Sequence, residues 1–176
     1  MEVARLFFGL PLPDEARAAL GAWQAAQASQ RHWTRPEGLH LTLAFLGMRP
    51  RARLSALTPM GEAVAGRHLA FRLRTTDLGG FPGPEAARVL WLGLTPSAAL
   101  EALTTDLRTT LDQAGEAFDA KPFRPHLTLA RLRPPRPVPA FLAPPPLNLV
   151  MDQFALFESG PQGCYTPLQA WPLRRV

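Results

Sequence analysis

The pentapeptide His-Leu-Thr-Leu-Ala occurs twice in this 176-residue chain, at residues 40–44 and again at 126–130. In each copy a histidine and a threonine stand two residues apart, and side chains at positions i and i+2 leave the same face of a β-strand. The two leucines of each copy would then point to the other face and anchor the strand in a core. Two such strands facing one another predict a cleft that holds two imidazoles and two hydroxyls.

The sequence around the two copies predicts a mixture of strands and helices. Strands are predicted where apolar residues run together or alternate with polar ones, at 5–10, 39–46, 69–78, 89–94, 126–132, 149–157 and 165–173. Helical spacing of apolar residues appears at 14–30, 54–64 and 97–114. Glycine- and proline-rich stretches at 79–84 and 133–146 predict loops.

The two copies also divide the chain into similar halves. The second begins at residue 126 and the first at residue 40, so 86 residues, close to half of the chain, separate them. Each copy lies in a series of strand, helix and strand. We therefore predict an internal duplication with pseudo-twofold symmetry, in a single bilobal domain that spans residues 1–176.

Composition restricts the setting in which the protein works. Hydrophobic content of 47% is enough for a core, and no apolar run approaches the roughly 18 residues of a membrane span. The first residues lack the pattern of a signal peptide. The single cysteine, Cys164, cannot form an internal disulfide. We expect a cytoplasmic protein with no membrane partner.

The charge of the chain favours an anionic partner. The net charge is +5, and Lys121 is the only lysine, so arginine supplies almost all of the positive charge. The guanidinium group matches the oxygens of a phosphate in a bidentate way. This bias is typical of nucleic-acid-binding proteins, although a genomic preference for arginine codons would produce it as well.

The paired histidines suit acid–base chemistry at phosphorus. With an unperturbed pKa of about 6.5, two histidines can hold opposite protonation states near neutrality. One can take a proton from an attacking hydroxyl or water while the other gives a proton to the leaving oxygen. The threonine hydroxyls can donate hydrogen bonds to the non-bridging oxygens. No carboxylate or cysteine accompanies either histidine, so we expect no metal and no cofactor.

The motif and its surroundings resemble a known family. The two His-Leu-Thr-Leu copies, with Phe123-Arg124-Pro125 before the second and Ala130-Arg131 after it, are similar to those of the 2H phosphoesterase superfamily. Within it they look like the RNA 2′,3′-cyclic phosphodiesterases, also called 2′-5′ RNA ligases. Three further stretches fit this branch: Arg-Leu-Phe-Phe at 5–8, Phe-Leu-Gly at 45–47 and Arg-Val-Leu-Trp at 88–91.

The resemblance implies a fold and an activity. The implied fold is a bilobal, pseudo-twofold α+β fold, with antiparallel sheets lining a central cleft and helices outside. The activity is a metal-free opening of 2′,3′-cyclic phosphate RNA ends to 2′-phosphomonoesters, and some members join RNA ends through a 2′-5′ bond. The implied partners are RNAs with such ends, tRNA fragments among them, and we expect a monomer.

The resemblance also implies the site residues. His40 and His126 are catalytic, His40 as the acid and His126 as the base, and Thr42 and Thr128 bind the substrate. Arg131 is an added phosphate contact. Strict alternation along a strand would place Arg131 on the face of the leucines, away from His126. It reaches the cleft only if the strand ends, twists or bulges there.

A second group of residues could contact RNA outside this motif. Trp33, Phe8 and Phe123 could stack on a base, although aromatic residues of a small domain belong mostly to the core. His32 and His68 lack the motif, and we interpret both as surface or loop residues.

Other functions use the same residues differently. The same site could open a cyclic phosphate on a small nucleotide, in which case the basic surface around the cleft would be short. A non-catalytic RNA-binding protein could use the cleft as a clamp, but binding alone needs no pair of titrating groups. A metal site built from His40 and His126 is weaker still, because threonine is a poor ligand.

Overall fold

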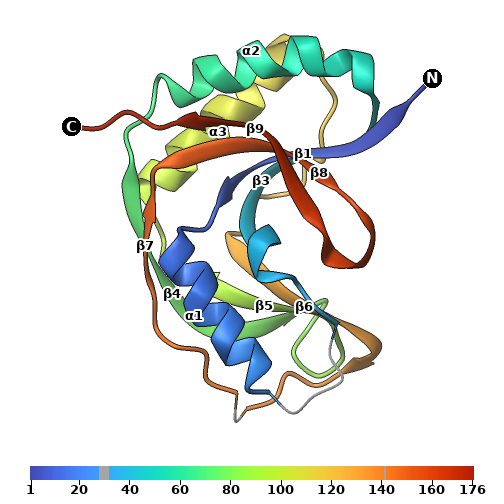
Figure 1. The fold of residues 1–176 in the computed structure, drawn as a ribbon, viewed down its shortest axis with the longest axis vertical. Helices are drawn as coiled ribbons and strands as arrows, with labels where there is room; N and C mark the ends of the chain where they lie inside the picture. Colours follow the sequence, from blue (N-terminus) through green and yellow to red (C-terminus); the bar gives the residue numbers. More distant parts are fainter. Residues whose placement is uncertain (28–31, 141) are drawn as a thin grey trace.

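The computed structural model describes residues 1–27, 32–140 and 142–176, and within them one curled antiparallel sheet carries the fold (Figure 1). Its strands are β1 (Val3–Pro11), β2 (His32–Trp33), β3 (His40–Pro50), β4 (Phe71–Phe81), β5 (Ala87–Leu94), β6 (His126–Arg136), β7 (Asn148–Met151), β8 (Gln153–Ser159) and β9 (Tyr165–Pro172). The helices are α1 (Asp14–Ala25), α2 (Leu54–Ala65) and α3 (Ala98–Gln113). Short 3₁₀ turns lie at Pro36–Gly38, Arg51–Arg53 and Pro161–Gly163.

The order of strands has the predicted twofold character. Along the sheet it reads β7-β4-β5-β6-β3-β1-β8-β9, with β2 also paired to β6. The two motif strands, β3 and β6, are neighbours at the centre, and they are flanked by β1 on one side and β5 on the other. The two halves therefore meet where the repeated motif lies, and the predicted α+β fold with pseudo-twofold symmetry is confirmed.

The helices bury apolar stripes on the sheet. In α3 the side chain of Ser97 accepts a hydrogen bond from the backbone N–H of Leu100, which caps the helix. Four leucines on its inner face are fully buried, at 100, 103, 107 and 111. Helix α1 begins after Pro13 with two acidic residues in its first turn, which suits the positive end of the helix dipole.

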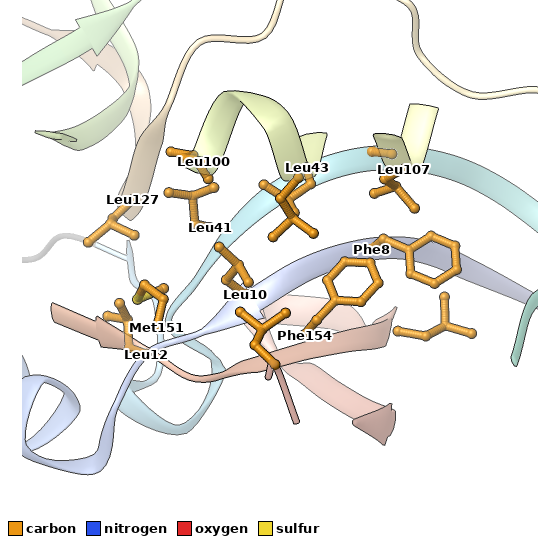
Figure 2. Close-up of a cluster of buried hydrophobic side chains, with 14 of the residues drawn as sticks. Phe8, Leu10, Leu12, Leu41, Leu43, Leu100, Leu107, Leu127, Met151 and Phe154 are labelled. Carbon is orange, nitrogen blue, oxygen red and sulfur yellow. The ribbon is translucent and has the colours of Figure 1, made fainter. Parts of the chain in front are cut away.

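The leucines of both motifs point into one continuous core. Leu41, Leu43, Leu127 and Leu129 have no solvent exposure. Figure 2 shows Leu41 and Leu127, which pair in the sheet, in the buried cluster that also holds Leu43 and Leu107 of α3. Because neighbouring residues of a strand point to opposite faces, the histidines and threonines are directed to the other side, away from this core.

Several element bounds differ from the sequence expectations. Strand β3 continues past Gly47 to Pro50, because Gly47 adopts φ +73° and the strand goes on pairing with β1. Strand β4 includes Gly79 and Gly80, predicted as loop, since a Cβ at Gly79 would lie 2.1 Å from the Trp91 ring that packs there.

Two further differences concern the C-terminal half. Strand β6 runs on to Arg136, which pairs with Ala87, although prolines occupy 134 and 135. The strand expected at 149–157 is two strands that separate at Asp152, because β7 pairs with β4 while β8 pairs with β1. Helix α1 ends at Ala25, and the predicted end near residue 30 lies outside the described residues.

In the part of the chain that the structure describes, no helix is long and apolar enough to cross a membrane.

Candidate active site

The central strand pair brings the four motif residues onto one face. Leu41 of β3 pairs with Leu127 of β6 in an antiparallel register. One step to either side, His40 therefore stands opposite Thr128, and Thr42 opposite His126. Residues directly opposite in an antiparallel pair share a face, so the four form a square with the histidines on one diagonal. This square, His40, Thr42, His126 and Thr128, is called the His-Thr face below.

Backbone carbonyls fix the orientation of both imidazoles. Nδ1 of His40 lies 2.6 Å from the carbonyl oxygen of Gly38, and Nδ1 of His126 lies 2.6 Å from that of Arg124. A carbonyl oxygen only accepts, so each Nδ1 carries the proton and each Nε2 is left with its lone pair. Nε2 of His40 lies 3.0 Å from the hydroxyl of Thr42. In both copies the carbonyl belongs to the residue two positions before the histidine.

His40 is enclosed by aromatic rings. Its ring centroid lies 4.5 Å from that of Phe7, 4.6 Å from that of Tyr165 and 5.3 Å from that of Phe157. Its exposed fraction is 9%. Burial in this apolar cage lowers the pKa of His40 to about 4, against the hydrogen bond to Gly38, and the charge of His126 lowers it further.

His126 occupies a more open position. Its ring meets that of Phe81 edge to face, with centroids 4.9 Å apart, and the residue is half-buried. Burial lowers the pKa of His126 too, while the hydrogen bond to the carbonyl of Arg124 opposes the shift. Both histidines are therefore neutral at pH 7 in the free protein.

Two hollows open on the His-Thr face. The larger hollow has a volume of about 850 Å³, and His40, Thr42 and Thr128 line it. The smaller hollow has a volume of about 430 Å³, and His126 and Thr42 line it. Phe45 lines both hollows. Each histidine thus lines its own hollow, and Thr42 lines both.

The larger hollow is basic and partly aromatic. Arg5, Arg35, Arg131 and Arg133 line it, together with Trp33, His32 and Tyr165. The guanidinium of Arg5 lies 4.9 Å from the centroid of the Phe45 ring. Sequence reasoning did not select Arg5, Arg133 or Tyr165 as site residues. Their placement depends on strand pairings that bring β1, β6 and β9 to one place.

The smaller hollow has a different lining. Phe81, Phe123, Arg108 and Lys121 contribute to it. The Nη1 group of Arg108 donates to the carbonyl oxygen of Lys121 over 2.8 Å, and its guanidinium lies 5.8 Å from the centroid of the Phe123 ring. Burial lowers the pKa of Arg108 from its usual value.

A β-bulge brings Arg131 to the larger hollow. Against β5, Ala130 pairs with Leu90 but Thr128 pairs with Trp91, so Leu129 is an extra residue in β6. The alternation of side chains is reversed after this bulge, and Arg131 falls on the side of His126 and Thr128. Strand β3 repeats the feature. Ala44 pairs with Phe8 and Thr42 with Gly9, which makes Leu43 the extra residue.

The remaining candidates fall in different places. Phe8 is fully buried in the core and cannot stack on a base, whereas Trp33 lines the larger hollow and Phe123 the smaller. His32, interpreted as a surface or loop residue, is exposed but sits in β2 and lines the larger hollow. Nε2 of His68 lies 2.7 Å from Oδ2 of Asp106, away from both hollows.

The described residues of this site offer few side chains that could ligate a metal ion. Within the residues that the structure describes, no three or more His, Cys, Asp or Glu side chains come close enough together to hold a metal ion.

Comparisons with known proteins agree in one family. A sequence model described as the 2′-5′ RNA ligase superfamily matches residues 12–165. An "RNA 2′,3′-cyclic phosphodiesterase" of Thermus thermophilus is 37% identical over 183 residues, which cover 97% of this chain and 90% of that protein. One from Geobacillus stearothermophilus is 34% identical over 134 residues, or 74% of this chain, but the match spans only 43% of its length.

A solved structure supports the same grouping. The crystal structure of Escherichia coli LigT complexed with NADP⁺ is 33% identical in sequence. It superposes with a TM-score of 0.74, over 98% of this chain and 99% of that one. The similarity therefore extends over both halves of the fold and includes both motif strands.

Proposed function

Since the chain belongs to the 2′-5′ RNA ligase superfamily, we propose that it is an RNA 2′,3′-cyclic phosphodiesterase that opens 2′,3′-cyclic phosphate ends to 2′-phosphomonoesters. The observation that carries this proposal is the His-Thr face. It holds two imidazoles, both neutral at pH 7 and both with Nε2 free of the backbone, on one diagonal of a square. A phosphate over the square lies between the two imidazoles, one of which becomes a proton donor when the bound phosphate favours its protonation.

The different linings of the two hollows support one direction for the reaction. In-line displacement places the entering and the leaving oxygen on opposite sides of phosphorus. The larger, arginine-lined hollow suits the RNA strand that carries the cyclic phosphate. His40, which lines it, is then next to the ribose and protonates the 3′-oxygen as the P–O3′ bond breaks. His126 lies on the other side and takes a proton from the attacking water.

The phosphate itself is held by hydrogen-bond donors. The hydroxyls of Thr42 and Thr128 occupy the second diagonal of the square and can donate to the non-bridging oxygens, where negative charge gathers. The Thr42 hydroxyl does so once His40 is protonated, because it then no longer donates to Nε2 of His40. Arg131 supplies a charged contact from the larger hollow. The negative charge of the phosphate favours a proton on the histidine pair and offsets the effect of burial.

Hydrolysis of a defined RNA tests this proposal. An oligonucleotide with a 2′,3′-cyclic phosphate end is incubated with the protein in the presence of chelator, and the product is scored as a 2′- or a 3′-phosphate. We expect the 2′-phosphate alone. His40→Ala and His126→Ala should each lower kcat by about 10²–10⁴-fold, the usual contribution of one proton transfer, with an unchanged circular dichroism spectrum.

The matched control is His68→Ala, because His68 lies outside both hollows. Its kcat should stay within twofold of the wild type. Turnover near the wild-type rate in either motif variant, or release of the 3′-phosphate, would contradict the proposed function.

A further inference from the structure

In each central strand, the bulge next to the repeated motif is held by a side chain from a helix. Nε2 of Gln24, in α1, donates to the carbonyl oxygen of Leu129 over 3.5 Å and to that of Thr34 over 3.2 Å. Nε of Arg108, in α3, donates to the carbonyl oxygen of Leu43 over 3.2 Å. Leu129 and Leu43 are the extra residues of β6 and β3. Both helices therefore bind the strand at the residue where its alternation is reversed.

The two contacts are related by the duplication. Gln24 and Arg108 are each the eleventh residue of their helix, counted from Asp14 and from Ala98. Each helix bonds to the motif strand of the other half. Helix α1, from the first half, bonds to β6 of the second half, and α3, from the second half, bonds to β3 of the first. Equivalent positions with different side chains make the same kind of bond, which indicates a role at the bulge rather than chance contact.

The burial of Gln24 indicates that its hydrogen bonds at the bulge are specific. It is 5% exposed, and a buried amide is costly unless its donors find acceptors. The carbonyl oxygen of Leu129 also accepts a hydrogen bond from the backbone N–H of Thr34 over 2.8 Å. The Gln24 amide thus ties the end of β2 to β6 at the bulge, two residues before Arg131.

We infer that Gln24 and Arg108 are positioning residues, which aim the side chains after each bulge at the active site. For Gln24 the side chain that it aims is Arg131, and for Arg108 it is Phe45. Without the bulge, alternation would direct position 131 to the core face beside Leu127 and Leu129. This inference rests on the proposed function, because it gives Arg131 a phosphate to bind.

Gln24 provides the cleaner test, because it lines neither hollow, whereas Arg108 lines the smaller one. Gln24→Met keeps the length of the side chain and removes the amide. We expect the KM for an oligonucleotide with a cyclic phosphate end to rise at least fivefold. We also expect the slope of log KM against log salt to fall by about 0.7, the value for one lost phosphate contact on a single strand. A role in folding alone would leave this slope unchanged.

The coupling to Arg131 is measured in a double-mutant cycle. Arg131→Ala should raise KM and lower the salt slope as Gln24→Met does, and the double variant should match Arg131→Ala within twofold. Gln27→Met is the matched control, since Gln27 lies two residues beyond the end of α1 and its side-chain amide donates to the carbonyl oxygen of Trp23 in that helix. If Gln24→Met does not fold, Gln24→Asn, whose amide is one methylene too short, takes its place.

The possible results distinguish a failure of the positioning role of Gln24 from a failure of the proposed hydrolysis. A wild-type salt slope in folded Gln24→Met, or effects on KM that multiply in the double variant, would overturn the positioning role. Arg131→Ala alone could change neither KM nor the salt slope while the wild type is active. Gln24 would then have no phosphate-binding side chain to position, and this inference would fail while the proposed hydrolysis would still stand. An inactive wild type would instead remove the proposed function.

Discussion

His40 and His126 occupy identical pentapeptides but different surroundings. The aromatic cage of Phe7, Phe157 and Tyr165 encloses His40, while the ring of His126 meets that of Phe81 edge to face. The sequence identifies the pair and its chemistry through the repeat. It does not reveal the cage, because one ring comes from β1 and the other two come from β8 and β9, near the other end of the chain.

The burial of both histidines sets the pH dependence. The reaction needs one histidine protonated and the other neutral, and this state is most abundant between the two pKa values of the pair. Burial lowers the pKa of His40 to about 4 and that of His126 below its ordinary 6.5. We therefore expect kcat/KM to peak between pH 4 and 6.5 and to fall as the pH rises through 7, rather than to centre on neutrality as the unperturbed pKa suggests.

A pH–rate profile at substrate concentrations far below KM measures this directly. The kcat profile should lie at higher pH than that of kcat/KM, because the bound phosphate favours the protonated pair. His68→Gln should leave both profiles in place. A maximum of kcat/KM at pH 7.5 or above would contradict the burial effect described for this site.

At the scale of elements, most strands and all three long helices are predicted by apolar periodicity, but the bulges are not. A bulge leaves only two adjacent buried residues as a trace, such as Leu129 and Ala130, and leucine followed by alanine is ordinary in any strand. From the sequence, one can see that strict alternation would put Arg131 on the core face and that only a bulge or twist would bring it to the site. The placement of Arg131 is resolved only by the pairing of β6 with β5.

Close approach of β1 to β3 depends on Gly9, which pairs with Thr42. A Cβ at this position would lie 2.6 Å from the carbonyl oxygen of Leu41, a backbone atom that cannot move aside cheaply. Gly9→Ala should lower the free energy of unfolding by about 1–3 kcal/mol, the usual cost of overpacking, and should reduce kcat by displacing Thr42.

Urea denaturation of Gly9→Ala checks the stability effect. Gly66→Ala is the control, because Gly66 has an ordinary φ of −67° and its Cβ would be 3.4 Å from the carbonyl oxygen of Glu62. Its stability should equal or slightly exceed that of the wild type. Equal stability of both variants would mean that β1 and β3 can separate without cost.

The whole molecule is a duplicated sheet whose two hollows have different linings around a shared site. The arginines Arg5, Arg35, Arg131 and Arg133 gather on the larger hollow, and β6 carries a further exposed arginine, Arg136, beyond it. The duplication is legible in the sequence because its motif is strictly repeated. The arginine surface is not, because its members are scattered from residue 5 to residue 136.

Because of this arginine surface, the salt dependence of KM can distinguish an RNA substrate from a small-nucleotide substrate. Each phosphate that an arginine contacts adds about −0.7 to the slope of log affinity against log salt for a single strand. The KM for a cyclic-phosphate oligonucleotide should therefore rise with salt more steeply than the KM for a cyclic mononucleotide. Measuring both across one salt series gives the comparison. Equal shallow slopes with equal efficiency would favour a small-nucleotide substrate.

The division of labour between the two histidines is the central claim, and a substrate with sulfur in place of the bridging 3′-oxygen tests it most directly. A thiolate leaves without being protonated, so the loss of the general acid ceases to matter on this substrate. We predict that His40→Ala cleaves it within about tenfold of the wild-type rate, while His126→Ala remains at least a hundredfold slower. Equal defects in both variants, or recovery of His126→Ala instead of His40→Ala, would contradict the assignment.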